Sequence, residues 1–239
     1  MSAASCKNDT VPIPDRGLGY YPVAVNRFWV YSVADSSWSQ ATSAQPTSAL
    51  QVSNYQFRET ITDVLTDAAG QTAYRLVRAK RLTPTAAWVD DSVFTLTATS
   101  NFVVLNRSNL RTLELIFPVR DDKQVWNINA FNNNANDTAR SPTRQYRDVG
   151  EPFTTKVGAT SQMYPDTVTT TNEGSAKSDD VFYVKTYRQV FAKWVGPVLR
   201  QRRRFDNYYQ NTSNGTTFFP NAYYFGFSRT ETLVDYGPR

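Results

Sequence analysis

Residues 27–33 read Arg-Phe-Trp-Val-Tyr-Ser-Val, a run of aromatic and β-branched residues that suits a pleated sheet. Because side chains alternate along a strand, Trp29 and Tyr31 share one face and Phe28 and Val30 share the other. We expect Trp29 and Tyr31 on the inner face of the sheet. Similar segments recur along the chain, with turn residues about every ten positions. The pattern predicts an all-β fold, a single-domain antiparallel β-sandwich or a barrel or half-barrel meander.

Three segments need a separate interpretation. Residues 50–64 look like one long strand, and the alternation slips at Arg58 and Glu59, which suggests a β-bulge, although irregular exposure would give the same pattern. Helical periodicity is conceivable only at residues 105–115. Near the end of the chain, strands at residues 181–192, 198–209 and 223–236 are expected, with a long Asn/Thr/Gly loop before the last of them.

The composition excludes several classes of chemistry. The 239 residues include no histidine and one cysteine, so Ser-His-Asp and Cys-His nucleophiles, His-ligated zinc or iron and multi-cysteine metal sites are ruled out. We therefore expect no metal and no cofactor. The net charge of +5 is modest and is not concentrated on one element, which argues against a nucleic-acid partner. The sequence contains no run of about 18 apolar residues, so we expect no transmembrane helix.

The single cysteine, Cys6, follows Ala3, Ala4 and Ser5. Small residues that end in a cysteine resemble the end of a bacterial lipoprotein signal peptide, in which the cysteine carries the lipid. Residues 7–19 are polar and contain proline, as in a tether. The alternative is an ordinary N-terminus with an incidental thiol. We expect a signal remnant and flexible tether at residues 1–19 and a single all-β domain at residues 20–239.

Residues 20–33, Tyr-Tyr-Pro-Val-Ala-Val-Asn-Arg-Phe-Trp-Val-Tyr-Ser-Val, resemble the Y-x-P-L-x-x-G-x-x-W-x-Y-x-V opening of uncharacterised Bacteroidota lipoproteins. The matching residues are Tyr21, Pro22, Trp29, Tyr31 and Val33, while Val23 stands for the usual Leu and Asn26 for the usual Gly. Residues 190–199 and 226–237 are similar to late segments of the same family. The resemblance implies an all-β fold and a lipid anchor at Cys6, and hence an outer-membrane lipoprotein of the cell envelope. It implies no activity.

The densest charge run is Arg-Gln-Arg-Arg-Arg at residues 200–204. On a strand, Arg200, Arg202 and Arg204 share a face. This stripe is either an anion-binding surface for phosphates, lipid headgroups or acidic glycans, or a set of charges that protects an edge strand from aggregation. Trp29 and Tyr31 are likewise open to two interpretations, a ligand-stacking platform or part of the core.

These observations favour a non-enzymatic, lipid-anchored binding or structural module. Its expected partners are the membrane, through Cys6, and an apolar ligand, a glycan or another protein. The alternative is a carboxylate-dependent glycan hydrolase, which needs no histidine. Adjacent carboxylates such as Asp90 and Asp91 point to opposite faces of a strand, so a catalytic pair would have to come from different strands.

Overall fold

The computed structural model describes residues 14–67, 69–108, 110–121, 124–131, 143–172 and 181–238. These residues form one antiparallel sheet of 12 strands and a short 3-10 helix, η1 (Leu18–Tyr20). The strands are β1 (Phe28–Trp38), β2 (Leu50–Thr66), β3 (Thr72–Arg81), β4 (Val89–Ala98), β5 (Phe102–Arg107), β6 (Leu110–Ile116), β7 (Val125–Asn127), β8 (Thr143–Val157), β9 (Thr160–Asn172), β10 (Tyr183–Ala192), β11 (Gly196–Thr212) and β12 (Gly215–Gly237).

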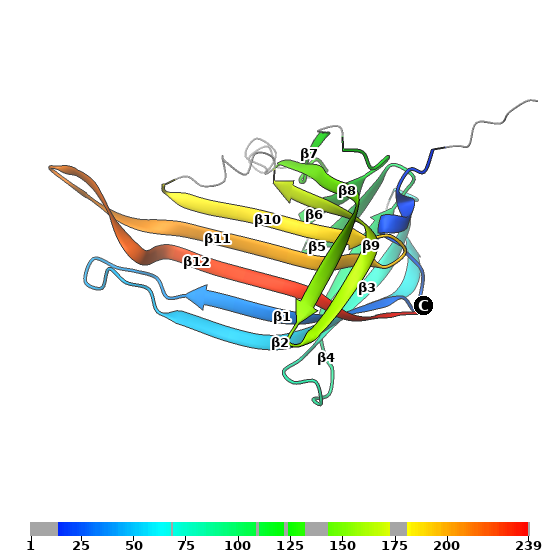
Figure 1. Ribbon diagram of the computed structural model, residues 1–239, viewed down its shortest axis with the longest axis horizontal. Helices are drawn as coiled ribbons and strands as arrows, with labels where there is room; N and C mark the ends of the chain where they lie inside the picture. Colours follow the sequence, from blue (N-terminus) through cyan, green and yellow to red (C-terminus); the bar gives the residue numbers. More distant parts are fainter. Residues whose placement is uncertain are drawn as a thin grey trace, which may run out of the picture.

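The sheet is a meander that curls until it is nearly a closed barrel (Figure 1). Strands that are consecutive in sequence lie side by side, and β1 pairs with β12, so the open seam falls between β6 and β7. Hydrogen bonds between described residues cross this seam. Leu113 N–H donates to the Ile128 carbonyl at 2.8 Å, and Trp126 Nε1 donates to the Leu113 carbonyl at 3.1 Å. The predicted all-β antiparallel meander is therefore confirmed.

The apolar core fills the inner face of this sheet, and Trp29 and Tyr31 lie at its centre. Both side chains are 0% exposed. Trp29 Nε1 donates to the Val195 carbonyl at 2.6 Å, and the Tyr31 hydroxyl donates to the Pro197 carbonyl at 3.0 Å. Their predicted inward orientation is correct. The interpretation of these rings as a ligand platform is wrong, because burial and hydrogen bonding leave neither ring face open to a ligand.

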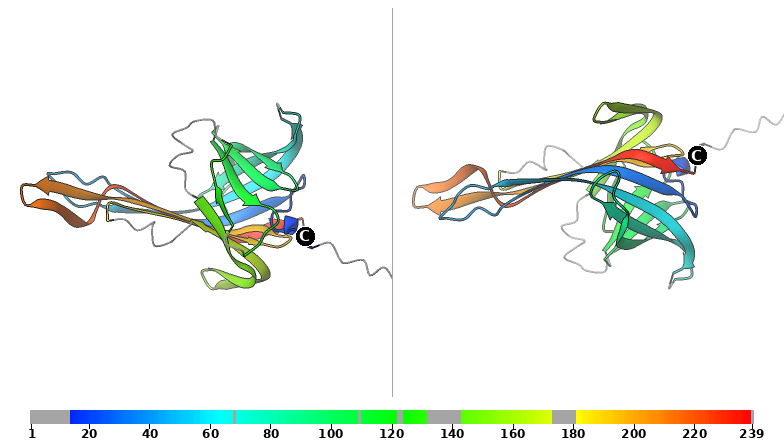
Figure 2. Two further views of the ribbon diagram at one scale, coloured as in Figure 1. Left: turned by 90° about the horizontal axis from the view of Figure 1, so that it is seen from above. Right: turned by 90° about the horizontal axis from the view of Figure 1, so that it is seen from below.

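A bent hairpin, β8 with β9, covers part of the outer face. The β8–β9 register jumps between Arg147 and Glu151, at a bend where Gly150 has a φ of +80°. Beyond the bend the hairpin crosses the long strands β10, β11 and β12 on the side opposite β3–β6 (Figure 2). Phe153 of this hairpin packs against the core cluster that includes Val190 and Leu199. Strands β10 and β11 are consequently buried on both faces in this region.

The longest strands continue past the barrel as an open extension (Figure 1). Residues 50–55 of β2 have no β3 partner, since that pairing begins at Gln56, and residues 183–187 of β10 have no β9 partner. Aromatic rings stabilise the extension. Trp38, Phe205 and Tyr223 stack edge to face or tilted with centroids 4.9–5.9 Å apart. A second ring cluster, Tyr208, Tyr209, Phe218 and Tyr224 with Phe182, lies nearer the tip.

Three sequence expectations need correction. The β1–β2 register runs without a shift through Arg58 and Glu59, and the irregularity in β2 lies further on, between Ile61 and Asp63. The described part of residues 105–115 belongs to the hairpin of β5 and β6 and contains no helix. The expected loop before the last strand is instead an extension of the β11–β12 hairpin, in which Thr212 pairs with Gly215.

The folded domain also begins before Tyr20, within the predicted tether. Val119 N–H donates to the Arg16 carbonyl at 3.0 Å, and Trp194 N–H donates to the Gly19 carbonyl at 2.7 Å. Lys193 Nζ lies 2.7 Å from a carboxylate oxygen of Asp15. The last residues before η1 are therefore fastened to the barrel.

Candidate functional site

Buried charges lie in the barrel interior among the residues of the apolar core. Glu59 of β2 is 1% exposed and accepts hydrogen bonds from two arginines that reach it from different strands. Arg78 of β3 donates through Nη2 at 2.5 Å, and Arg200 of β11 donates through Nη2 at 2.9 Å. Arg200 Nη1 also donates to Glu231 of β12 at 3.2 Å. Arg200 thus links two carboxylates across the interior.

These ion pairs keep their members charged at neutral pH. Burial alone raises the pKa of a carboxyl, but the charges of Arg200 and Arg78 outweigh that effect and hold the pKa of Glu59 well below its usual range. The pKa of Glu231 is lowered by the same balance of burial and arginine charge. Burial lowers the pKa of Arg200, and Glu59 and Glu231 reverse this and raise it. The site holds fixed charges and offers no proton near neutral pH at these groups.

A second set of arginines lies nearer the extension. Tyr187 of β10 has the guanidinium of Arg144 (β8) 3.7 Å from its ring centre and that of Arg202 (β11) 5.6 Å from it. Arg107 of β5 lies 5.1 Å from the ring of Phe94. Burial, and after it the neighbouring charges of Arg202 and Arg200, lower the pKa of Arg107 to about 10. These guanidinium groups therefore share one electrostatic environment.

Together these side chains form what we call the interior charge cluster, defined as Glu59, Arg78, Arg107, Glu114, Arg144, Arg200, Arg202 and Glu231. Glu114 lies 3.7 Å from Arg144, which is an ion pair but too long for a hydrogen bond. Among the described residues, no group of His, Cys, Asp or Glu is arranged to hold a metal ion.

The structure places the predicted arginine stripe on one face, as expected, with a gradient of burial. Arg200 is 2% exposed, Arg202 is half-buried, and Arg204 is exposed and pairs with Asp206 at 2.6 Å. The edge-protection interpretation is wrong, because β11 lies between β10 and β12 inside the sheet. Arg200 does not belong to a surface, because its side chain is buried and its charge is neutralised by Glu59 and Glu231. Cys6 lies outside the described residues.

Sequence reasoning missed the partners of the stripe. Glu59 stands at an inward position, in alternation with Phe57 and Ile61, so its charge interrupts an apolar face. A charged residue at this inward position was the feature of the sequence that could have indicated a buried ion pair. Arg107 and Arg144 gave no comparable signal, because their strands are short or weakly patterned.

Comparison with protein families, with curated proteins and with solved structures finds no match to this chain. No helix in the described part of the chain is long and apolar enough to cross a membrane.

Proposed function

We propose that the protein is a non-enzymatic binding module of the cell envelope, anchored by a lipid at Cys6, and that the free edge of β2 in the extension binds a protein partner. The observation that carries this proposal is the edge formed by residues 50–54. These residues pair with β1 on one side and with no described strand on the other. Leu50 is 54% exposed and Val52 is 59% exposed.

An edge of this kind invites strand addition. Natural sheets protect free edges with lysine, proline or bulges, and residues 50–54, Leu-Gln-Val-Ser-Asn, contain no such feature. An extended peptide that pairs with the edge would satisfy its backbone groups and place apolar side chains against Leu50 and Val52. The opposite edge of the extension, on β10, carries Lys185 and is less suited to such pairing.

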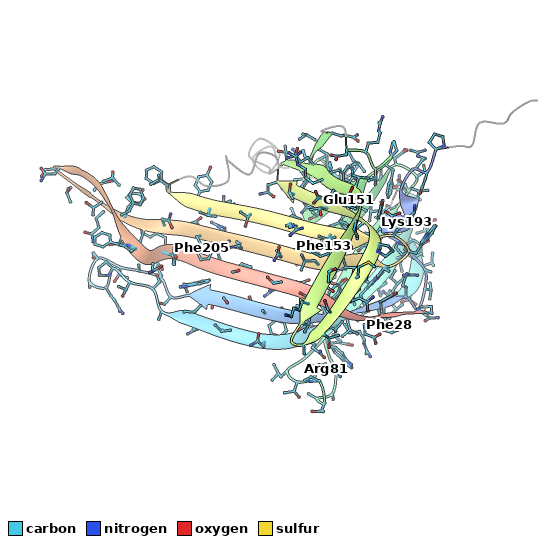
Figure 3. All side chains as sticks on the ribbon, in the orientation of Figure 1. Phe28, Arg81, Glu151, Phe153, Lys193 and Phe205 are labelled. Carbon is cyan, nitrogen blue, oxygen red and sulfur yellow. The ribbon has the colours of Figure 1, made fainter. Side chains whose placement is uncertain are left out.

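The place where the described chain starts fits an anchored protein that presents the free edge of β2. The described chain starts at the barrel end that also holds the C-terminal strand end, and the extension projects from the other end (Figure 1). Lys193 and Phe28 mark the first end, and Phe205 lies on the extension (Figure 3). A lipid at Cys6 would therefore leave the extension directed away from the membrane.

The interior carboxylates give no support to the hydrolase alternative. A glycosidase needs one carboxyl that stays protonated near neutral pH, which requires a raised pKa. Glu59 and Glu231 are held ionised by Arg200, with a lowered pKa in each case. A binding role fits these fixed charges better.

The anchor is tested by expressing the chain behind a lipoprotein signal peptide and comparing it with the Cys6→Ser variant. The wild-type protein should partition into the detergent phase, since several buried acyl chains contribute about 0.8 kcal/mol per methylene, and the variant should stay in the aqueous phase. Equal partitioning of the two proteins would contradict the anchor.

The partner surface is tested by placing a photo-crosslinking residue at position 50 in cells. We expect a discrete adduct whose cross-linked peptide comes from an extended segment of another protein. A second change, Val52→Lys, should abolish the adduct because it puts a charge on the pairing edge. Ala34→Lys is the control, since Ala34 is exposed but pairs on both sides, with Asn54 of β2 and with Thr230 of β12. An adduct that persists in Val52→Lys would refute the edge as the binding surface.

A further inference from the structure

The interior charge cluster holds more positive than negative charge. It contains five arginines and three glutamates, which leaves an excess of two positive charges. Glu59 and Glu231 are engaged by Arg78 and Arg200, and Glu114 is engaged by Arg144. The ion pair between Asp35 and Arg229, whose charged atoms are 2.6 Å apart, has no net charge and so does not offset the positive excess of the cluster.

The excess is carried by the arginines nearest the extension. Within the described residues, Arg107 and Arg202 form no ion pair with a carboxylate at 4 Å or less, and their guanidinium groups lie 5.1 Å from the ring of Phe94 and 5.6 Å from the ring of Tyr187. Burying a charge without a counter-charge is costly, so natural interiors pair such groups. The charge of Arg202 is also the largest of those that lower the pKa of Arg107.

Several N–H groups of the same arginines lack an acceptor among the described residues. These donors are Nε of Arg107, Nε and Nη1 of Arg144, and Nε of Arg200. Arg144 is 3% exposed, so bulk water does not replace the missing acceptors. Buried polar groups are almost always hydrogen-bonded, and an arginine without acceptors in this setting indicates a site for a bound acceptor group.

The arginine side chains of β11 become more exposed toward the extension. Burial decreases along β11 from Arg200 through the half-buried Arg202 to the exposed Arg204, on one face of the strand. A ligand that approaches along this face meets Arg204 first and Arg202 next.

We propose that Arg107, Arg144 and Arg202 bind a phosphate group at this end of the barrel. A phosphate monoester carries about two negative charges at neutral pH, which equals the excess of the cluster. Its oxygens accept hydrogen bonds from several guanidinium groups at once, in the forked geometry that arginine favours. Free phosphate and a phospholipid headgroup share this chemistry. The site is separate from the β2 edge and does not depend on a partner there.

The test is isothermal titration of the full chain at constant ionic strength, with inorganic phosphate in one arm and short-chain phosphatidic acid below its micelle concentration in the other. Arg202→Gln and Arg107→Gln should each weaken binding at least tenfold. Arg204→Gln is the matched control, because it lies on the same face of the same strand but pairs with Asp206, and it should bind as the wild type does. Binding in the first arm assigns free phosphate, and binding in the second arm alone assigns a lipid headgroup.

Thermal unfolding separates binding from folding. Phosphate should raise the Tm of the wild type and of Arg204→Gln above the value in chloride, and it should leave the Tm of Arg107→Gln unchanged. Without phosphate, Arg107→Gln should unfold no lower than the wild type, because it removes an uncompensated charge. The proposal is refuted if neither ligand binds the wild type, or if phosphate raises the Tm of Arg107→Gln as much as that of the wild type.

Discussion

Replacing Glu59 by glutamine should destabilise the fold strongly. Glu59 is 1% exposed and accepts three hydrogen bonds within 3.1 Å from Arg78 and Arg200, so the change leaves two buried arginines with weaker partners. Breaking a buried ion pair by removing one partner costs about 3–5 kcal/mol. For a chain of this size that loss lowers the Tm by roughly 6–20 °C. Urea unfolding at pH 7, followed by tryptophan fluorescence, measures it.

The pH dependence of this variant provides a second measurement. The pKa of Glu59 is lower in the folded than in the unfolded protein, so its contribution is fully present above the unfolded value of about 4.3. That contribution is lost as the pH falls from there toward the lowered folded pKa. The Glu59→Gln variant lacks it, and its stability should fall less steeply with acid below about pH 4.3.

The control for Glu59→Gln is Asp63→Asn. Asp63 lies 3.3 Å from Arg75 on the same strand pair, and both side chains are 49% exposed, so this substitution should cost less than about 1 kcal/mol. If Glu59→Gln cost no more than Asp63→Asn, or if its acid slope equalled that of the wild type, the reasoning about the buried ion pairs would be wrong.

Further predictions concern the rings and one glycine. Trp29→Ala should cost about 3–5 kcal/mol by urea unfolding, because the ring is 0% exposed and its loss leaves a cavity and an unpaired Val195 carbonyl. Gly196→Ala should cost about 2–4 kcal/mol, since Gly196 has a φ of +104° and an added Cβ would lie 2.9 Å from Trp29 Nε1. Trp38→Ala removes the ring that lies over Gly226, so amide exchange should accelerate in the extension and stay unchanged in the barrel.

The sequence was a good guide to the strands. Alternation at residues 27–33 predicted both β1 and the inward orientation of Trp29 and Tyr31, because both follow from local geometry. The slip at Arg58 and Glu59 was misread as a bulge. The backbone is regular there, and the interruption is a buried carboxylate whose partners come from β3 and β11. A single strand does not reveal partners that are distant in sequence.

The candidate site was predicted only in part, for the same reason. The charge run at residues 200–204 predicted that Arg200 and Arg202 share a face of a strand, and the register of β11 with β12 agrees. Whether the face is buried depends on strand order, since β11 lies between neighbours instead of at an edge. Arg107 and Arg144 reach the cluster from strands whose closeness arises only when the sheet curls. Curvature of that kind is a property of the whole meander.

The pairing of β1 with β12 has a consequence for how the chain folds. It sets Phe28 opposite Gly237, so the last strand to be synthesised must find the first, and the sheet cannot be completed earlier. Every other strand pair joins neighbours in sequence. A circular permutant that keeps residues 14–27, joins the natural ends through a linker and has its new ends between β6 and β7 would turn this one distant pairing into a pairing of neighbours in sequence. Because folding rates rise as contacts become more local, the permutant should reach the same sheet faster than the natural chain.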